Sequence, residues 1–449
     1  MNKKNKIIWL CTLEFLSRFH PIKYDQVPLV LPLLRDFQKY IKRHYKKAYH
    51  WKKNSPLKKA VHTACEPYLI NEQPVVKKER KLLVRAQLFP LTKHFKNSQC
   101  IYIAHHKKEY QEARTHKECR PLLYLPRIPE TKIAGTAEKK IQNQLKKIFR
   151  SRNTPRFFRT KAFTTWMWKN TRNLLIKIRK VHTLFKKYSF SGVLYGSTIN
   201  RHGALVTTFA QTRKIKTVNL QHGLFGEIGH LPVNAHLNFV WGKSHQDYLL
   251  AFGAPKQKIK MVPPVFIRNN SLGLSDFTDK RSVPPAPPLK VLVALQPLGA
   301  QHNHTMIRRI ENAAKRYPGK VLVSYKLHPD QSRKLYQKQI RSSSSKLLSH
   351  SGNSLHNLMK WCDIIITPYS TVAYEGLLCK KAVVFYGRPQ PFYYLKGCAT
   401  FVKTEEDIKK LFLQLIKHPT FLSTLINQLS LKDDIKNHSY APLAIENYL

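Results

Sequence analysis

Two stretches decide the fold of this chain: YKLHP, from Tyr325 to Pro329, and DIIITPYSTVAYEG, from Asp363 to Gly376. Each contains or follows a short apolar run rich in β-branched residues, Val321–Val323 in the first case and Ile364–Ile366 in the second. Both runs stop at a loop of Pro, Ser, Thr or His residues, after which a helix is expected. Because ligands of parallel α/β sheets bind at the carboxyl ends of strands, both loops are predicted to lie at a ligand site.

The second loop has the residues that an anion site needs. Ser370 and Thr371 are good N-cap residues, so the following helix would direct unpaired N–H groups and the positive end of its dipole at a bound phosphate. Glu375 lies about one helical turn further on, where its carboxylate is expected to accept hydrogen bonds from sugar hydroxyls. The sequence therefore predicts a site for a nucleotide sugar.

Length and composition indicate two folded domains and a large positive net charge. The chain has 449 residues, enough for two domains that each have their own core, and 42% of them are hydrophobic, which excludes a disordered chain. The 79 Lys and Arg residues outnumber the 25 Asp and Glu residues, giving a formal net charge of +54. Such a charge calls for a polyanionic partner, namely nucleic acid, an acidic membrane surface or an acidic substrate.

The cysteines and the N-terminus indicate a cytoplasmic protein. The seven cysteines include no C-x-x-C pair, so we expect them to be reduced and structural. The only apolar stretch near the N-terminus, Ile7–Leu16, is short and contains Glu14, which predicts neither a membrane span nor a signal peptide.

The first third of the chain is the least regular. Lys6–Thr12 is predicted to be a strand, and apolar residues from Leu33 to Ile41 have helical spacing among many cations. That basic amphipathic helix fits packing on its own domain better than docking on a membrane surface. The aromatic and basic segment Thr160–Lys187 fits a helix with a buried stripe better than a single-stranded nucleic-acid site.

Alternation of strands and helices becomes clear after residue 190. Predicted strands at Gly192–Ser197, Ile215–Gly223 and His236–Gly242 alternate with helices, the last of which is expected to be capped by Ser244. A linker rich in Asn, Ser and Pro is predicted at 271–289. It separates an N-terminal domain, 1–270, from a C-terminal domain, 290–449.

In the C-terminal domain the alternation restarts. Strands are predicted at 290–295, 320–326, 363–367 and 382–385, and helices at 305–316, 331–340, 354–361, 371–379 and 405–417, the last capped by Thr404. The predicted fold class is α/β, with two Rossmann-like domains of parallel sheet facing across a cleft.

The motifs together resemble the GT-B transferases of bacterial surface polymers, in particular the CDP-glycerol glycerophosphotransferases and the capsule and polysialic acid transferases. The resemblance covers Gly192–Lys417 and rests on a His-Gly pair at 222–223, a Lys-x-His-Pro at 326–329 and a Tyr-Ser-Thr loop at 369–371. The chain departs from the usual Asp-Tyr-Ser-Ser loop of the glycerophosphotransferases, since Pro368 precedes Tyr369.

The resemblance implies a role for each motif. His222 would be the catalytic base on the acceptor side, with Gly223 giving the backbone a sharp turn, and Glu227 and His230 in the same loop are the alternatives. Donor phosphates would be bound by residues of the C-terminal domain, namely Lys326, His328, Ser370 and Thr371. The chemistry agrees, because displacing a nucleotide needs a base for the acceptor hydroxyl and cations or dipoles for the departing phosphate.

Three functions are compatible with the sequence. The favoured one is a glycosyltransferase or glycerophosphotransferase that uses a donor of the CMP or CDP type to build or extend a cell-surface polysaccharide. It would need no cofactor or metal, since there is no Asp-x-Asp, and His302 and His304 have no obvious third partner. Its acceptor would be an acidic or lipid-linked glycan at the inner face of the cytoplasmic membrane, with an anionic membrane surface as a partner. The alternatives are a nucleotide-sugar 2-epimerase and, least favoured, a nucleic-acid-binding protein on an inactive GT-B scaffold.

Overall fold

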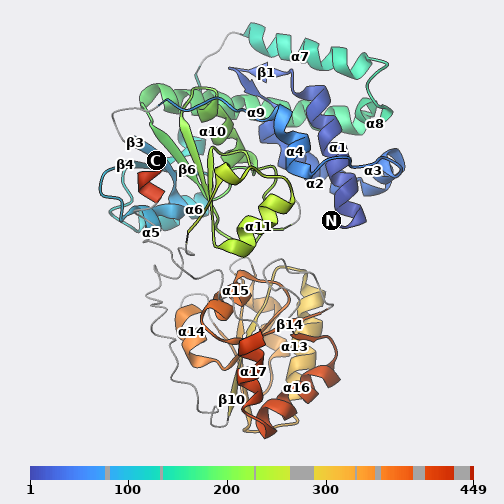
Figure 1. The fold of residues 1–449 in the computed structure, drawn as a ribbon, viewed down its shortest axis with the longest axis vertical. Coiled ribbons are helices and arrows are strands. Elements are labelled where there is room, and N and C mark those ends of the chain that lie inside the picture. The colour runs from blue at the N-terminus through green and yellow to red at the C-terminus, as the bar shows by residue number, and fades with distance from the viewer. Residues whose placement is uncertain are drawn as a thin grey trace. The chain divides into compact units, whose positions relative to one another are not determined.

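The computed structural model describes residues 1–75, 81–131, 135–226, 229–262, 288–328, 331–348, 355–387, 400–428 and 445–449. Glu227 and most of the predicted linker, 271–287, lie outside the described residues. The chain divides into two compact units, Met1–Pro263 with His438–Leu449, and Pro264–Asn437. Figure 1 shows both units with their elements labelled.

The first unit is built on a parallel sheet. Its strand order is β5 (Leu122–Tyr124), β4 (Gln99–Ala104), β3 (Lys81–Arg85), β6 (Gly192–Tyr195), β7 (Lys216–Leu220), β8 (Leu237–Val240) and β9 (Ile259–Met261). Every neighbouring pair in this order is parallel. The chain winds outward from β3 in one direction and from β6 in the other, so the order reverses between these two strands.

Helices surround this sheet and extend it on one side. They are α1 (Lys3–Phe19), α2 (Val30–Arg43), α3 (Tyr45–Lys52), α4 (Val61–Cys65), α5 (Phe89–Thr92), α6 (Lys107–Arg114), α7 (Gly135–Arg150), α8 (Arg156–Arg159), α9 (Lys161–Lys187), α10 (Arg201–Gln211) and α11 (Lys243–Ala251). In Figure 1 helices α1, α2, α3, α7 and α8 gather at one side of the unit. A two-stranded antiparallel ribbon, β1 (Lys23–Tyr24) with β2 (Val27–Pro28), lies among them.

The basic helices pack on their own unit, as the sequence predicts. Helix α2 packs against α1 and α10, and its Phe37 ring stacks on Phe15 of α1 at a centroid distance of 4.1 Å. Helix α9 buries a stripe that runs from Phe163 to Leu184, with Met167 and Ile178 fully buried in it. The apolar stripe of this helix is therefore part of the core, and the half-buried ring of Trp166 packs on Phe37 of α2.

The second unit repeats the same topology. Its strand order is β12 (Ser345–Leu347), β11 (Val321–Lys326), β10 (Leu289–Ala294), β13 (Ile364–Thr367), β14 (Ala382–Tyr386) and β15 (Thr400–Val402), again parallel throughout. The helices are α13 (Ala300–Ala314), α14 (Leu355–Trp361), α15 (Thr371–Leu378), α16 (Glu405–Lys417) and α17 (Phe421–Gln428). The strand order reverses between β10 and β13.

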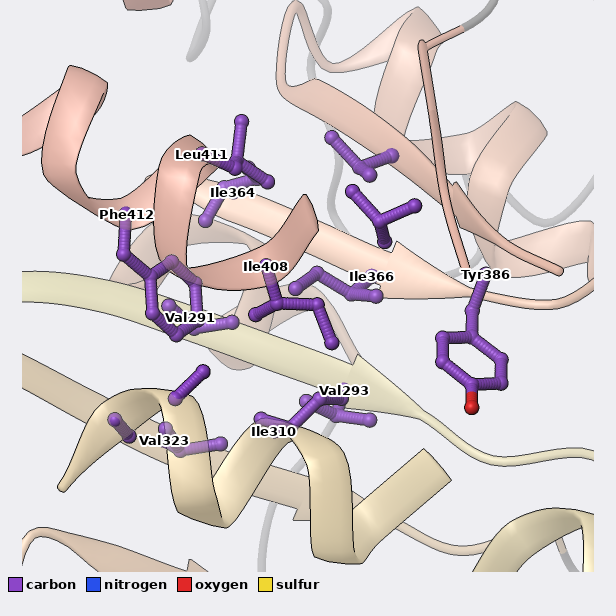
Figure 2. Packing of buried hydrophobic residues seen from close by; sticks show 14 of the residues in the cluster. Val291, Val293, Ile310, Val323, Ile364, Ile366, Tyr386, Ile408, Leu411 and Phe412 are labelled. Atoms are coloured by element: carbon purple, nitrogen blue, oxygen red, sulfur yellow. The ribbon is translucent and has the colours of Figure 1, made fainter. Parts of the chain in front are cut away.

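The core of the second unit lies between its sheet and the helices α13 and α16. Figure 2 shows Val293 of β10 and Ile366 of β13 close to Ile408 of α16, and Ile310 of α13 beneath β10. All four side chains are fully buried. Helix α16 begins at a capping box, which confirms the predicted Thr404 cap. The Thr404 side chain accepts from the backbone N–H of Asp407, and the Asp407 side chain accepts from the backbone N–H of Thr404.

Three predictions of local structure are wrong. Lys6–Thr12 belongs to helix α1, because its apolar run continues through Phe15 and Phe19 at helical spacing and is buried on several sides. Helix α11 starts directly after Gly242, which has a φ of 122°, so Ser244 lies inside the first turn and does not cap it.

The predicted helix at 331–340 is replaced by two 3₁₀ turns, Arg333–Leu335 and Gln337–Gln339. Tyr336 is buried, whereas Leu335 is 52% exposed, so this segment has no continuous apolar stripe to stabilise an α-helix.

Residues 445–449 pack against the first unit, which the sequence did not predict. The buried Glu446 carboxylate accepts hydrogen bonds from the backbone N–H groups of Lys96 (2.9 Å) and Asn97 (2.7 Å), and Ile445 is fully buried. Within the described residues, no helix is both long enough and apolar enough to cross a membrane.

Candidate functional site

The candidate donor site lies at the carboxyl ends of β10, β11 and β13, where the strand order of the second unit reverses. In doubly wound sheets this is where a ligand finds space between diverging connections. Thr367 at the end of β13 donates to the carbonyl of Ala294 at the end of β10 (2.9 Å), which joins the two strand ends.

Ser370 caps helix α15 and connects to the loop after β10. Its hydroxyl accepts from the backbone N–H of Val372 (3.1 Å) and from the side-chain amide of Gln296 (3.0 Å). The cap leaves the N-terminus of an eight-residue helix at the reversal point of the sheet. Ser370 and Thr371 were both predicted to be N-cap residues. Thr371 is the first residue of the helix, so Ser370 alone occupies the N-cap position.

A second amide, Gln331, fixes the loop that carries His328. The Gln331 side chain accepts a hydrogen bond from the backbone N–H of His328 (2.8 Å) and donates one to the carbonyl of Gln296 (3.0 Å). The backbone N–H of Gln331 donates to the carbonyl of His328 (2.9 Å). Gln296 and Gln331 therefore hold the loops after β10, β11 and β13 in one hydrogen-bonded unit. The half-buried Lys326 lies at the end of β11, where desolvation lowers the pKa of its ammonium group.

Glu375 lies deeper than the sequence predicted. It is 8% exposed, and burial raises the pKa of its carboxyl to about 8. Helix α15 packs closely on the sheet, since a Cβ at Gly376 would lie 2.5 Å from Cδ1 of Ile365. Glu375 is therefore protonated at neutral pH in the free protein and can donate as well as accept a hydrogen bond.

The candidate base, His222, follows β7 in the first unit. Its Nδ1 contacts the carbonyl oxygen of Gly196, which directly follows β6. A carbonyl can only accept, so Nδ1 carries the proton and Nε2 keeps its lone pair. Space at Gly196 is limited, because a Cβ there would lie 2.7 Å from Nε2 of the flexible Gln87 side chain and 3.3 Å from the His222 ring.

Burial and charge keep the imidazole of His222 neutral. Desolvation lowers its pKa and nearby Arg85 lowers it further, while the bond to Gly196 acts in the opposite direction. His222 as a whole residue is nevertheless exposed to solvent, so a substrate can approach it even though protein atoms crowd the ring. A neutral, accessible imidazole with a fixed tautomer can accept a proton at Nε2.

The loop that carries His222 is fixed by hydrogen bonds of Gln221, a residue that the sequence analysis did not identify. Its buried side chain accepts from the backbone N–H of Trp241 (3.0 Å) and donates to the carbonyl of Gly223 (3.0 Å). Gly223 itself has room for a Cβ and no positive φ. The sharp turn expected at Gly223 therefore does not depend on a glycine there.

Two of the candidate bases, His222 and His230, are neighbours. The rings of His230 and His222 lie 6.4 Å apart, and His230 packs against Phe225 at 4.6 Å. Burial lowers the pKa of His230 to about 3, so this imidazole holds a proton poorly. Glu227 lies outside the described residues.

Sequence reasoning also missed a group of cations and imidazoles near His222. Arg85 ends β3, His105 follows β4, and His202 lies in the first turn of α10 after β6. Of these, only His105 directly follows a strand, so the strand-end rule that identified His222 could have found His105 alone. Lys177 on α9 offers no such signal, since its position depends on how that helix packs.

Metal ligands do not gather in the part of the chain that the structure describes, where no group of three or more His, Cys, Asp or Glu residues is placed to hold an ion. His304 contacts the carbonyl of Leu335 (3.1 Å), and the ring of His302 packs edge-on against Tyr386.

Residues 296–402 match the model of the CDP-Glycerol:Poly(glycerophosphate) glycerophosphotransferase family. This segment begins at Gln296 and includes Lys326, His328, Ser370, Thr371 and Glu375. No curated protein sequence matches the chain.

Solved structures resemble both units. The chain is similar to S. aureus MnaA in a co-structure with UDP, at 14% identity over 82% of this chain and 95% of that chain, with a TM-score of 0.52. It is also similar to the UDP-GlcNAc 2-epimerases of Neisseria meningitidis, bound to UDP-GlcNAc (15% identity, 82% and 99% covered, TM-score 0.50), and of Methanocaldococcus jannaschii (12% identity, 82% and 99% covered, TM-score 0.51).

At these identities the likeness establishes the fold alone. The predicted GT-B fold, with two Rossmann-like domains of parallel sheet, is confirmed. The family-model match adds that the second unit carries the sequence pattern of a nucleotide-activated transferase.

Proposed function

We propose that this protein is a transferase that moves a glycosyl or glycerophosphate group from a nucleotide-activated donor, of the CMP or CDP type, onto a growing cell-surface polysaccharide. The observation that carries the proposal is the hydrogen-bonded set Gln296, Gln331 and Ser370, which fixes the His328 loop and the N-terminus of α15 at the reversal point of the second sheet. This set lies within the segment that matches the glycerophosphotransferase family.

The roles follow from the chemistry of each group. The donor's phosphates bind Lys326, His328 and the capped N-terminus of α15, which stabilise the charge that develops on the leaving nucleotide. Nε2 of His222 takes the proton from the acceptor hydroxyl as its oxygen forms the new bond to the donor group, and the bond from that group to the nucleotide breaks. Glu375 hydrogen-bonds sugar hydroxyls of the donor.

Turnover with defined donors tests the proposal. The protein is incubated with CDP-glycerol or with CMP- and UDP-activated sugars, and nucleotide release is followed with and without a polysaccharide acceptor. We expect acceptor-dependent release from a CMP- or CDP-type donor. Conversion of UDP-GlcNAc to its 2-epimer without an acceptor would instead support an epimerase, the activity named for two of the structural neighbours.

We also propose that the protein works at an anionic membrane surface, where lipid-linked acceptors are held. Helix α7 supports this, since four of its lysines are exposed on one short helix: Lys139, Lys140, Lys146 and Lys147. Each cation near an anionic bilayer contributes about 1 kcal/mol of attraction.

Vesicle co-sedimentation measures this contribution. Changing the four α7 lysines to Gln removes about 4 kcal/mol of attraction, so binding to vesicles with anionic lipid should weaken by about a hundredfold to a thousandfold, and added salt should also weaken the wild type. The matched control removes four exposed lysines of the second unit, namely Lys315, Lys320, Lys334 and Lys338. Equal binding of the wild type to neutral and anionic vesicles, or an equal loss in the control, would contradict membrane docking through α7.

A further inference from the structure

A second polar cluster lies at the strand ends of the first unit, beside His222. The strand order reverses between β3 and β6, and β4 lies next to β3 on the other side. Arg85 ends β3, His105 follows β4, and Tyr195 ends β6. This edge is therefore the position in the first sheet that corresponds to the donor site of the second.

Two imidazoles at this edge are stacked and incompletely hydrogen-bonded. The rings of His105 and His202 lie 4.7 Å apart and nearly parallel, at 14°. His105 is 3% exposed, and its Nε2 contacts the hydroxyl of Tyr195 at 2.9 Å. Nδ1 of both rings is buried, and within the described residues neither has a hydrogen-bond partner. Buried polar atoms without partners are costly, so they mark a place where a ligand can complete the bonding.

The charges around these rings leave an excess cation. Arg85 pairs with Glu109, whose other oxygen accepts from the backbone N–H of His105 (2.8 Å). Arg201 pairs with Asp36. Lys177 forms no ion pair with any described residue, and burial together with the charge of Arg201 lowers its pKa to about 8.

Burial also keeps the two imidazoles uncharged. It lowers the pKa of His202 to about 3 and the pKa of His105 well below the usual range, and in both cases the charges of Arg85 and Lys177 act in the same direction. A bound dianion between these groups would pair with the charge of Lys177. It would also raise the pKa of the two imidazoles, because a nearby negative charge favours their protonated form.

We propose that Lys177, His105 and His202 form a phosphate-binding subsite, which holds a phosphate group of the acceptor while His222 acts on the acceptor's hydroxyl. Three N–H donors that come from α9, the end of β4 and the start of α10 suit a phosphate, which presents several acceptor oxygens in different directions. The assignment of this phosphate to the acceptor depends on the proposed transferase function; the anion site itself does not.

Two adjacent residues at the end of β6 connect this subsite to His222. The hydroxyl of Tyr195 bonds to His105, and the carbonyl of Gly196 bonds to Nδ1 of His222. Arg85 interacts electrostatically with both His222 and His202. A phosphorylated acceptor anchored at Lys177 is therefore held beside the imidazole that accepts its proton. Acceptors of the favoured class would carry a phosphate close to the hydroxyl that reacts.

Phosphate binding to the full-length protein tests the subsite. Isothermal titration with inorganic phosphate is performed in a His328→Ala background, in which the phosphate site proposed for the second unit is weakened. Lys177→Gln and His202→Gln should each weaken phosphate binding by about tenfold, the loss expected for one charge-assisted hydrogen bond. Lys169→Gln is the matched control, because it removes the same charge from an exposed position on the same helix.

The outcomes separate this inference from the proposed function. Equal losses in Lys177→Gln and Lys169→Gln, or no saturable phosphate binding, would overturn the subsite, and tighter binding of glucuronate than of phosphate at the same residues would overturn its assignment to phosphate. A parallel titration with CDP should be unaffected by Lys177→Gln. If CDP fails to bind the wild type while phosphate binding still depends on Lys177, the transferase proposal fails and the anion site stands.

Discussion

Apart from the additional edge strand β9 of the first unit, the two units have the same strand order, yet the side chains at their strand ends differ in kind. The first unit places imidazoles after β4, β6 and β7, namely His105, His202 and His222. The second unit places amides, a hydroxyl and a helix N-terminus at the corresponding edge, with Gln296, Gln331 and Ser370 as the connecting groups. The same fold thus gives one edge at which His222 can accept a proton and another at which amide and backbone N–H groups can hold an anion.

Burial sets the charge state at both edges. It lowers the pKa of the imidazoles in the first unit, so they are neutral near pH 7. It raises the pKa of Glu375 in the second unit, so this carboxyl is protonated there. Burial therefore holds these imidazoles and the Glu375 carboxyl uncharged before ligands arrive, and the charge of a ligand changes their protonation.

Replacing His222 should produce the largest effect. His222→Ala removes the proposed base, so turnover should fall by about 10² to 10⁴-fold while the affinity for CDP, measured by calorimetry, stays unchanged. His230→Gln serves as the comparison, because a group with a pKa near 3 contributes little as a base. A larger loss in His230→Gln than in His222→Ala would transfer the role to His230.

The buried carboxyl of Glu375 should make stability depend on pH. A carboxyl whose pKa is raised from 4.5 to about 8 stabilises the folded state most at low pH, and this contribution is lost as pH rises through that range. Wild type should lose about 1.4 kcal/mol for each pH unit between about pH 5 and 8 relative to Glu375→Gln, which cannot ionise.

Denaturant unfolding at several pH values measures this difference. Glu406→Gln is the control, since Glu406 is exposed on α16 and should follow the wild-type profile. Parallel profiles for wild type and Glu375→Gln would contradict the protonated state assigned to Glu375.

Loss of one contact to the donor nucleotide should reduce nucleotide affinity modestly and leave the first unit unaffected. His328→Ala should weaken binding of CMP or CDP by about tenfold, as expected for one charge-assisted contact, without changing the melting temperature. His418→Ala, which removes an exposed imidazole at the end of α16, should leave affinity unchanged. Unchanged nucleotide affinity in a folded His328→Ala variant would remove His328 from the site.

The helix cap should give the smallest effect. Ser370→Ala removes the acceptor for Val372 and Gln296, which should cost about 1 kcal/mol of stability and also weaken nucleotide binding. Thr371→Ala should cost less stability, because Thr371 is the first helical residue and not the cap. If Ser370→Ala loses stability but keeps its nucleotide affinity, the loop serves only as a cap.

Strand-end chemistry was the part of the site that the sequence revealed best. His222 and Ser370 were identified because each lies in a polar loop after a predicted strand, and the structure places His222 after β7 and Ser370 at the N-cap of α15, after β13. Gln296 and Gln331 were missed because an amide in a loop has no distinctive spacing, and their role arises only when three loops meet. Lys177 was missed because its position depends on the packing of α9.

The fold was predictable where apolar runs were short and flanked by turn residues. Both parallel sheets follow from that pattern. The prediction from apolar runs was wrong at α1. The uninterrupted apolar run from Ile7 to Leu10 is typical of a strand, but tertiary packing buries it as part of a helix. The prediction also failed at 331–340, where polar residues with helical propensity lack an apolar stripe.

Hydrogen–deuterium exchange of the full-length protein with and without CDP tests the central claim most directly, namely that the second unit binds the donor nucleotide. We predict that CDP slows exchange in peptides containing Gln296, His328 and Ser370, and leaves peptides containing Arg85, His105 and His222 unchanged. Slower exchange confined to the strand ends of the first unit would contradict the account.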